Sequence, residues 1–168
     1  MQLHRHPYTP ATLADGAELR LRSLGPDDLE LLERFFYSLS PESVYRRFMS
    51  PVPRPSVELG TKLLAVDHRD SEAVAAFHGG EIVGVARYAL GPAGHDLAIV
   101  VADAWQRRGV STVLLGRLMA LARSRGIRSF NANLLADNRP VIEMIRHAFP
   151  GARFERAGSE LEARISLL

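Results

Sequence analysis

The sequence contains no cysteine among its 168 residues. Disulfide bonds, a thiol nucleophile and thiolate metal ligands are therefore excluded. Long apolar runs are missing as well, because no stretch approaches the roughly 18 consecutive apolar residues of a membrane-spanning helix. The first 16 residues also lack the apolar core of a signal peptide. We therefore expect a cytoplasmic protein.

Histidine and basic residues are present, but they follow no metal or nucleic-acid pattern. The six histidines show no HExxH or comparable spacing, so no metal site is predicted. The formal net charge is +2, and the arginines are scattered without interleaved aromatic residues, which disfavours a nucleic-acid-binding module. A compact anion bound by a local basic turn fits this charge balance better than a polyanion does.

The length and composition are those of one ordinary globular domain. A chain of 168 residues can bury a sizeable core, and its apolar and charged fractions are 46% and 24%. Residues 1–17 are polar and contain two prolines, so we expect an irregular N-terminal arm there. A single domain is predicted over residues 18–168.

Hydrophobic periodicity and breaker residues predict the elements of this domain. Strands are predicted at Glu18–Ser23, Glu72–His78, Glu81–Leu90, Leu97–Val101, Arg128–Leu135 and in two segments within Arg153–Leu168. Helices are predicted to begin near Pro26, Ser40, Ser56, Val110 and Asp137. Helices grouped early, followed by a sheet with two packed helices, indicate an α+β fold.

The rest of the chain is organised around the segment from His95 to about Arg125. Leu97–Val101 is typical of a buried strand, and from Val110 onward apolar residues recur at the spacing of an amphipathic helix. Between strand and helix lies the turn Gln106-Arg107-Arg108-Gly109-Val110-Ser111-Thr112. A helix N-terminus offers unpaired N–H groups and the positive end of a dipole, and Gly109 lets a ligand approach. The turn therefore indicates a phosphate site; the alternative is a plain strand–helix connection with solvated arginines.

The order of elements, together with Gln106-Arg107-Arg108-Gly109-Val110-Ser111, resembles the GNAT family of acyl-CoA-dependent N-acetyltransferases. That family's phosphate-binding signature is Gln or Arg, two residues, Gly, one residue, then Gly or Ala, and Ser111 stands at the last position here. The sequence DNRP after the next strand also matches, and the resemblance covers Glu18–Leu168. It implies the GNAT acyl-CoA N-acyltransferase fold: a mixed, mostly antiparallel central sheet flanked by helices, with splayed central strands.

Three segments narrow this resemblance. SLSPESVYRRFMSPVPR (38–54), GEIVGVARY (80–88) and VVADAWQRRG (100–109) are similar to the catalytic domain of bacterial protein lysine acetyltransferases. The resemblance implies an enzyme that moves an acetyl group from acetyl-CoA to a primary amine. A protein lysine is the first-choice acceptor and a small-molecule amine the second. A catalytically silent acyl-CoA-binding module is the alternative from another class, and the oligomeric state is left open.

The same resemblance assigns roles to single positions. The family's general base, a Glu at the start of the central strand, corresponds to Asp96, and His95 on the opposite strand face is the weaker alternative. Backbone groups of Ile99 and Val101 are expected to pair with the pantetheine arm of CoA. A tyrosine that many members use as general acid corresponds to Met144, which donates no proton. Further CoA contacts are expected from Gln106, Arg107, Arg108, Gly109, Val110, Ser111, Thr112 and Asn138.

Two points about the site stay open at this stage. Asn138 is a candidate helix N-cap as well as a candidate contact to the CoA arm. Arg46, Arg47 and Arg54 lie in the least readable part of the chain, residues 26–66, where the family builds its acceptor groove. These arginines either favour an acidic substrate surface or form a solvated face.

Overall fold

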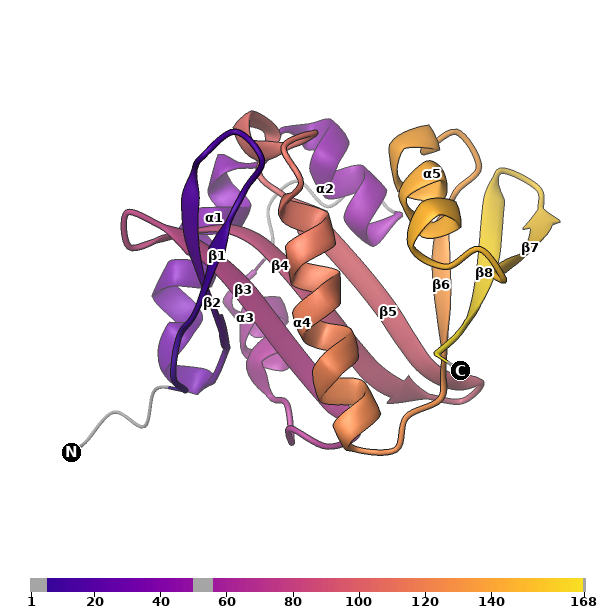
Figure 1. The fold of residues 1–168 in the computed structure, drawn as a ribbon, viewed down its shortest axis with the longest axis horizontal. Coiled ribbons are helices and arrows are strands. Elements are labelled where there is room, and N and C mark those ends of the chain that lie inside the picture. The colour runs from indigo at the N-terminus through magenta and orange to yellow at the C-terminus, as the bar shows by residue number, and fades with distance from the viewer. Residues whose placement is uncertain (1–5, 50–55, 168) are drawn as a thin grey trace.

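The computed structural model describes residues 6–49 and 56–167. One eight-stranded sheet carries helices on both of its faces (Figure 1). Its strands are β1 (Thr9–Thr12), β2 (Glu18–Ser23), β3 (Ser71–His78), β4 (Glu81–Gly91), β5 (Gly94–Val101), β6 (Ser129–Leu135), β7 (Arg153–Ala157) and β8 (Glu160–Ser166). The helices are α1 (Leu29–Ser38), α2 (Pro41–Phe48), α3 (Val57–Leu64), α4 (Val110–Ser124) and α5 (Arg139–Ala148), with short 3-10 turns η1 (Pro26–Asp28) and η2 (Asp103–Trp105).

The strands follow the order β1-β2-β3-β4-β5-β6-β8-β7. Every neighbouring pair is antiparallel except β5 and β6, which are parallel. These two strands pair only at Asp96 and Asn131, and they diverge from there toward the carboxyl end of β5 (Figure 1). The predicted α+β fold with splayed central strands is therefore confirmed, and the opening begins directly after Asp96.

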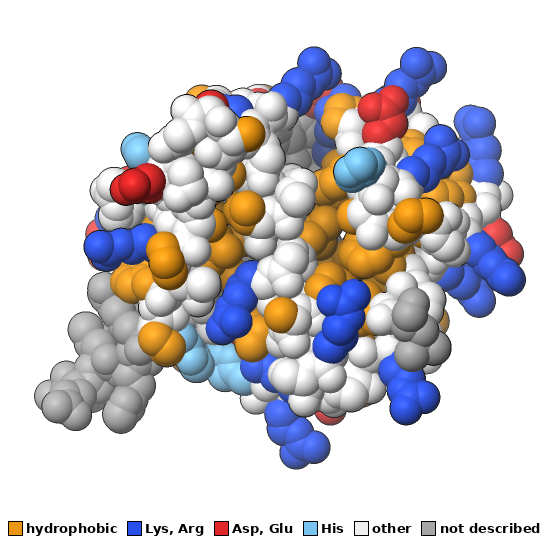
Figure 2. Space-filling model, in the orientation of Figure 1, with side chains coloured by type: hydrophobic (Ala, Val, Ile, Leu, Met, Phe, Trp, Pro, Cys, Tyr) orange, Lys and Arg blue, Asp and Glu red, His pale blue; other side chains and the backbone are white. Residues whose placement is uncertain are grey.

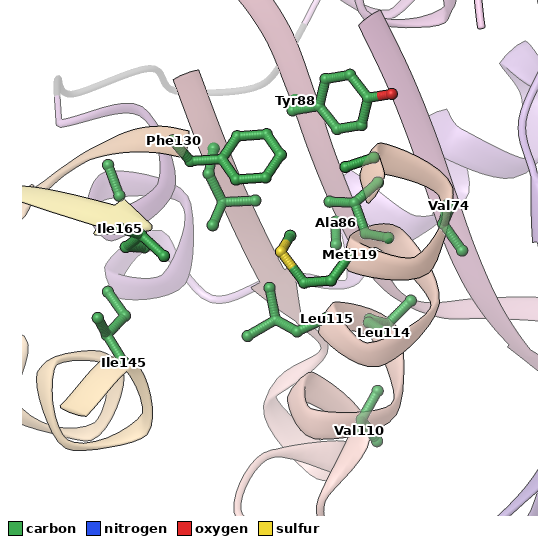
Figure 3. Packing of buried hydrophobic residues seen from close by; sticks show 14 of the residues in the cluster. Val74, Ala86, Tyr88, Val110, Leu114, Leu115, Met119, Phe130, Ile145 and Ile165 are labelled. Atoms are coloured by element: carbon green, nitrogen blue, oxygen red, sulfur yellow. The ribbon is translucent and has the colours of Figure 1, made fainter. Parts of the chain in front are cut away.

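Strand alternation divides the core between the two faces of the sheet. On one face, Val110, Leu114 and Leu118 of α4 are buried against β3 and β4 (Figure 3). The helix comes very close at Gly84, where a Cβ atom would lie 2.9 Å from Leu114 Cδ1. On the other face, α1 and α3 cover a second cluster that includes Val100 of β5. Because α4 is fixed so closely to the sheet, its N-terminus has a fixed position next to the end of β5.

The expectation of an irregular arm over residues 1–17 was wrong in part. Thr9–Thr12 form the edge strand β1, which pairs with β2 in register Thr9–Leu21 to Thr12–Glu18. Proline is tolerated in an edge strand because one side of that strand needs no ladder hydrogen bonds, so Pro10 does not prevent pairing. Residues 1–5 of the expected arm lie outside the described residues. The described helices include none with the length and apolar character needed to cross a bilayer.

A buried ion pair fixes β2 to the start of the helical segment. Arg22 and Asp28 form two hydrogen bonds of 2.8 Å each, and their side chains are 1% and 3% exposed. Removal of one partner leaves an uncompensated buried charge. We therefore expect Arg22→Met to lower the free energy of unfolding by about 3–5 kcal/mol, measured by urea denaturation. The double variant Arg22→Met/Asp28→Asn should lose less, and an equal loss would contradict the charge argument.

Candidate active site

A cavity of about 310 Å³ lies at the carboxyl end of β5, between α2, α4 and α5. It is lined by nine of the ten residues predicted to contact CoA, all except Arg108: Ile99, Val101, Gln106, Arg107, Gly109, Val110, Ser111, Thr112 and Asn138. Residues separated by up to 39 positions in the chain therefore meet around one opening. The structure thus brings the predicted binding residues together.

The turn before α4 is shaped to receive an anion. Gly109 has a φ of 93° and Arg107 a φ of 61°, so the backbone turns through the left-handed region on both sides of Arg108. No side chain caps the N-terminus of α4, and its first turn holds no acidic residue. Uncapped N–H groups at the positive end of a helix dipole are a favourable site for a phosphate group. The backbone of this turn therefore fits the pyrophosphate of CoA.

The two arginines of the turn have different surroundings. Arg107 lines the cavity. The Arg108 guanidinium lies over the Trp105 ring, 4.1 Å from its centroid, and its Nε donates to Asp15 Oδ2 at 2.7 Å. Asp15 belongs to the turn between β1 and β2, and the hydrogen bond from the backbone N–H of Ala17, followed by the contact with Arg108, lowers the pKa of Asp15. Arg108 thus ties the β1–β2 turn to residues 106–112, which we call the phosphate loop after their predicted role.

The sequence did not predict the contacts that residues 103–106 form with α2. Gln106 donates through Nε2 to the hydroxyl of Ser43 and to the carbonyl of Val101, both at 3.1 Å. Asp103 accepts the backbone N–H of Ser40 at 3.0 Å. Ser40 is the N-cap of α2, which the sequence did indicate as a helix start. The loop that shapes the cavity is therefore also bonded to the helix that forms one of its walls.

A smaller cavity of about 50 Å³ occupies the space between the splayed strands. Its walls come from residues 97–99 of β5, residues 132–134 of β6 and side chains of α5. It shares Arg47, Ile99, Asn138 and Met144 with the larger cavity, so the two adjoin. An extended ligand bound at the phosphate loop can therefore reach the gap between β5 and β6.

Asn138 faces this space and does not cap its helix. It occupies the N-cap position of α5, but its side chain forms no capping hydrogen bond. The residue is only 5% exposed, and it lines both cavities. A buried amide normally has hydrogen-bond partners. Its position therefore favours the predicted ligand contact over the N-cap role.

Asp96 and His95 lie on opposite faces of β5, as strand alternation predicts. Asp96 is exposed and lies at the closed end of the gap, on the face shared with Val100, and it lines neither cavity. His95 packs on the α4 side against the rings of Tyr88 and Phe130, with centroid distances of 5.8 and 6.3 Å. Of the two candidate bases, only Asp96 lies on the face of the sheet that α1 and α3 cover.

A wider groove of about 1010 Å³ continues from this site along the surface between α4 and α5. Apolar side chains such as Leu115 and Met119 form part of its wall, and Arg107, Arg123 and Arg139 contribute positive charge. Hydrophobic side chains with basic neighbours are visible on this face of the molecule in Figure 2. The site is therefore open to solvent along α4.

Comparison with known proteins agrees with this geometry. Residues 30–149 match the Acetyltransferase (GNAT) family. The chain belongs to this family, whose acyl donor is acetyl-CoA.

Individual relatives point to one group within the family. The chain is 32% identical over 136 residues to Acetyltransferase Pat of Mycolicibacterium smegmatis. The aligned region covers 77% of this chain and 40% of that protein. It is 32% identical over 139 residues to Acetyltransferase PA5475 of Pseudomonas aeruginosa, covering 79% of this chain and 75% of the relative. The crystal structure of the GNAT domain of S. lividans PAT has a TM-score of 0.88 at 33% identity, covering 95% of this chain and 97% of that one.

Proposed function

We propose that this protein transfers an acetyl group from acetyl-CoA to a primary amine, with a protein lysine side chain as the first-choice acceptor. The observation that carries the proposal is the uncapped N-terminus of α4, opened by Gly109, which faces a cavity adjoining the gap between β5 and β6. A phosphate site and a channel for an extended arm are what a CoA thioester requires. The similarity to proteins named Pat supports the choice of acceptor.

The chemistry begins with the acceptor. A lysine ammonium has a pKa near 10.4, so a base must remove its proton before the nitrogen attacks. Asp96 is the proposed base, acting directly or through one water, and it lies where the gap between the strands begins. The neutral nitrogen then forms a bond to the thioester carbonyl carbon.

The second half of the reaction releases the thiolate. Strand β5 has no β6 partner beyond Asp96, so backbone N–H groups around Ile99 are available to a ligand, and one of them would stabilise the oxyanion. The carbon–sulfur bond breaks, the sulfur leaves with its electron pair, and the nitrogen, which still carries one proton more than the amide, gives that proton to water. Met144, which lines the cavity, cannot protonate the thiolate, so water also supplies a proton to the sulfur.

A panel of acceptors tests the proposal. The purified protein is mixed with acetyl-CoA and with lysine peptides or small amines, and release of the CoA thiol is followed by a colorimetric reagent. We expect thiol release that depends on the acceptor, with lysine peptides turned over faster than simple amines. Faster turnover of small amines than of lysine peptides would make a small-molecule amine the acceptor instead of a protein lysine. Tight CoA binding without thiol release for any acceptor would instead show a silent acyl-CoA-binding module.

A further inference from the structure

Two arginine side chains on the face of the sheet that carries Asp96 have no carboxylate partner in the part of the chain that the structure describes. Arg47 of α2 and Arg87 of β4 line the same small cavity beneath α1. The Arg87 Nε donates to the carbonyl of Leu63 at 3.3 Å, and the Arg47 guanidinium lies 4.8 Å from the centroid of the Phe48 ring. Within residues 6–49 and 56–167, no carboxylate lies within 4.0 Å of either guanidinium.

The adjacent arginine of α2, Arg46, does have a carboxylate partner. Arg46 forms an ion pair with Glu42 at 3.0 Å, one helical turn earlier. Arg47 is half-buried, and unlike Arg46 it also lines the small cavity that contains Arg87. Its burial, and then the positive charge of Arg87, lower the pKa of Arg47 to about 10. Burial also lowers the pKa of Arg87.

Such an arrangement costs free energy unless an anion neutralises it, because both desolvation and like-charge repulsion disfavour the charged forms. A ligand anion would supply this neutralisation, since no carboxylate of the described part of the chain lies within 4.0 Å of either guanidinium. The donor is a poor source. Arg47 lines the cavity in which the phosphates are expected, but Arg87 does not, and the arm between the phosphates and the thioester carries no charge. The acceptor is therefore the remaining source.

The position of the pair agrees with an acceptor group. Arg87 is paired with Ala98 across β4 and β5, and Asp96 lies two residues earlier on the same face. Diagonal neighbours of this kind are about 7–8 Å apart. Arg47 lines both cavities described above as well as the one it shares with Arg87. Arg87 thus lies on the same face of the sheet as the proposed base, and Arg47 of α2 shares a cavity with Arg87 on that face.

We propose that Arg47 and Arg87 bind a carboxylate of the acceptor, so that the preferred substrate is an amine carrying a carboxylate within roughly one lysine length. This inference rests on the proposed function. The carboxylate is either the acidic side chain of a residue beside a peptide lysine or the free carboxylate of an amino acid. Both offer the same bidentate partner to a guanidinium.

Acceptors that differ only in one carboxylate test the proposed role of Arg47 and Arg87. N-α-acetyl-lysine is compared with N-α-acetyl-lysine amide, and a lysine peptide flanked by glutamate with its glutamine counterpart. We expect kcat/KM about 10-fold higher or more for the carboxylate form of at least one pair, from charge-assisted hydrogen bonds. The pair that shows the preference identifies the source of the carboxylate. Arg87→Gln should reduce the ratio to near 1 without changing KM for acetyl-CoA, and Arg87→Lys should restore part of it.

Arg128→Gln serves as the control, because Arg128 is exposed directly before β6 and lines none of these cavities. An equal kcat/KM for the carboxylate and amide forms in the native protein, or a preference that survives in Arg87→Gln, would overturn the proposal. If no acceptor is turned over, the proposed function has failed. Calorimetric binding of N-α-acetyl-lysine and its amide to the native protein and Arg87→Gln then decides the carboxylate site by itself.

Discussion

Replacement of Asp96 with asparagine is expected to lower kcat at pH 7 by about 100-fold or more, which is the usual range for loss of a general base. Asparagine keeps the size and polarity of the side chain but cannot take a proton. Asp96 lies outside the cavity that the CoA phosphates would occupy, so the affinity for CoA should change by less than about twofold. Steady-state rates and calorimetric binding of CoA measure the two quantities separately.

The pH dependence distinguishes a base from a structural residue. As the pH rises toward the lysine pKa near 10.4, more of the acceptor amine loses its proton in solution. The ratio of native to Asp96→Asn rates should therefore fall steadily between pH 7 and pH 9.5. Asp96→Glu, which restores the longer carboxylate, is the control and should keep most of the activity. An unchanged rate for Asp96→Asn at pH 7 would remove Asp96 from the base role.

The parts of the fold that were predictable are those with a strong local period. The bounds of β2, Glu18–Ser23, agree with the alternating pattern, and α4 begins at Val110 as its apolar spacing indicates. Strand β1 was not predicted because Thr9–Thr12 has no apolar alternation. It forms a strand only because β2 offers an edge to pair with. Its existence is a property of the sheet rather than of its own four residues.

The candidate site likewise has a part that a local sequence motif predicts and a part that depends on distant contacts. The phosphate loop is contiguous from Gln106 to Thr112, so a short motif was sufficient to indicate it. The bond from Gln106 to Ser43 joins positions 63 residues apart, and no local pattern contains it. The sequence presents Arg47 only as one of three arginines in residues 46–54, for which an acidic substrate surface and a solvated face are equal alternatives. Its proximity to Arg87 depends on how α2 lies over β5, the strand next to β4, which the tertiary fold alone determines.

Replacement of Gly109 with valine is expected to raise the Kd for CoA by about 100-fold or more. Gly109 has a φ of 93°, which a β-branched residue adopts only with strain. The backbone of the turn is therefore expected to change its conformation to relieve that strain. The N–H groups at the start of α4 would then no longer converge on one phosphate position. Loss of two charge-assisted hydrogen bonds of about 1.5–3 kcal/mol each accounts for this magnitude.

The matched control for this variant is Gly158→Val. Gly158 has a φ of 64° and open space around it, but it lies in the turn between β7 and β8, at the far edge of the sheet. Both variants carry comparable backbone strain, so thermal unfolding should show similar losses of stability. Only Gly109→Val should lose CoA binding by calorimetry. Retained affinity in Gly109→Val would show that this turn does not hold the phosphates. An equal loss of affinity in Gly158→Val would also contradict the assignment, because backbone strain alone would then explain the loss in Gly109→Val.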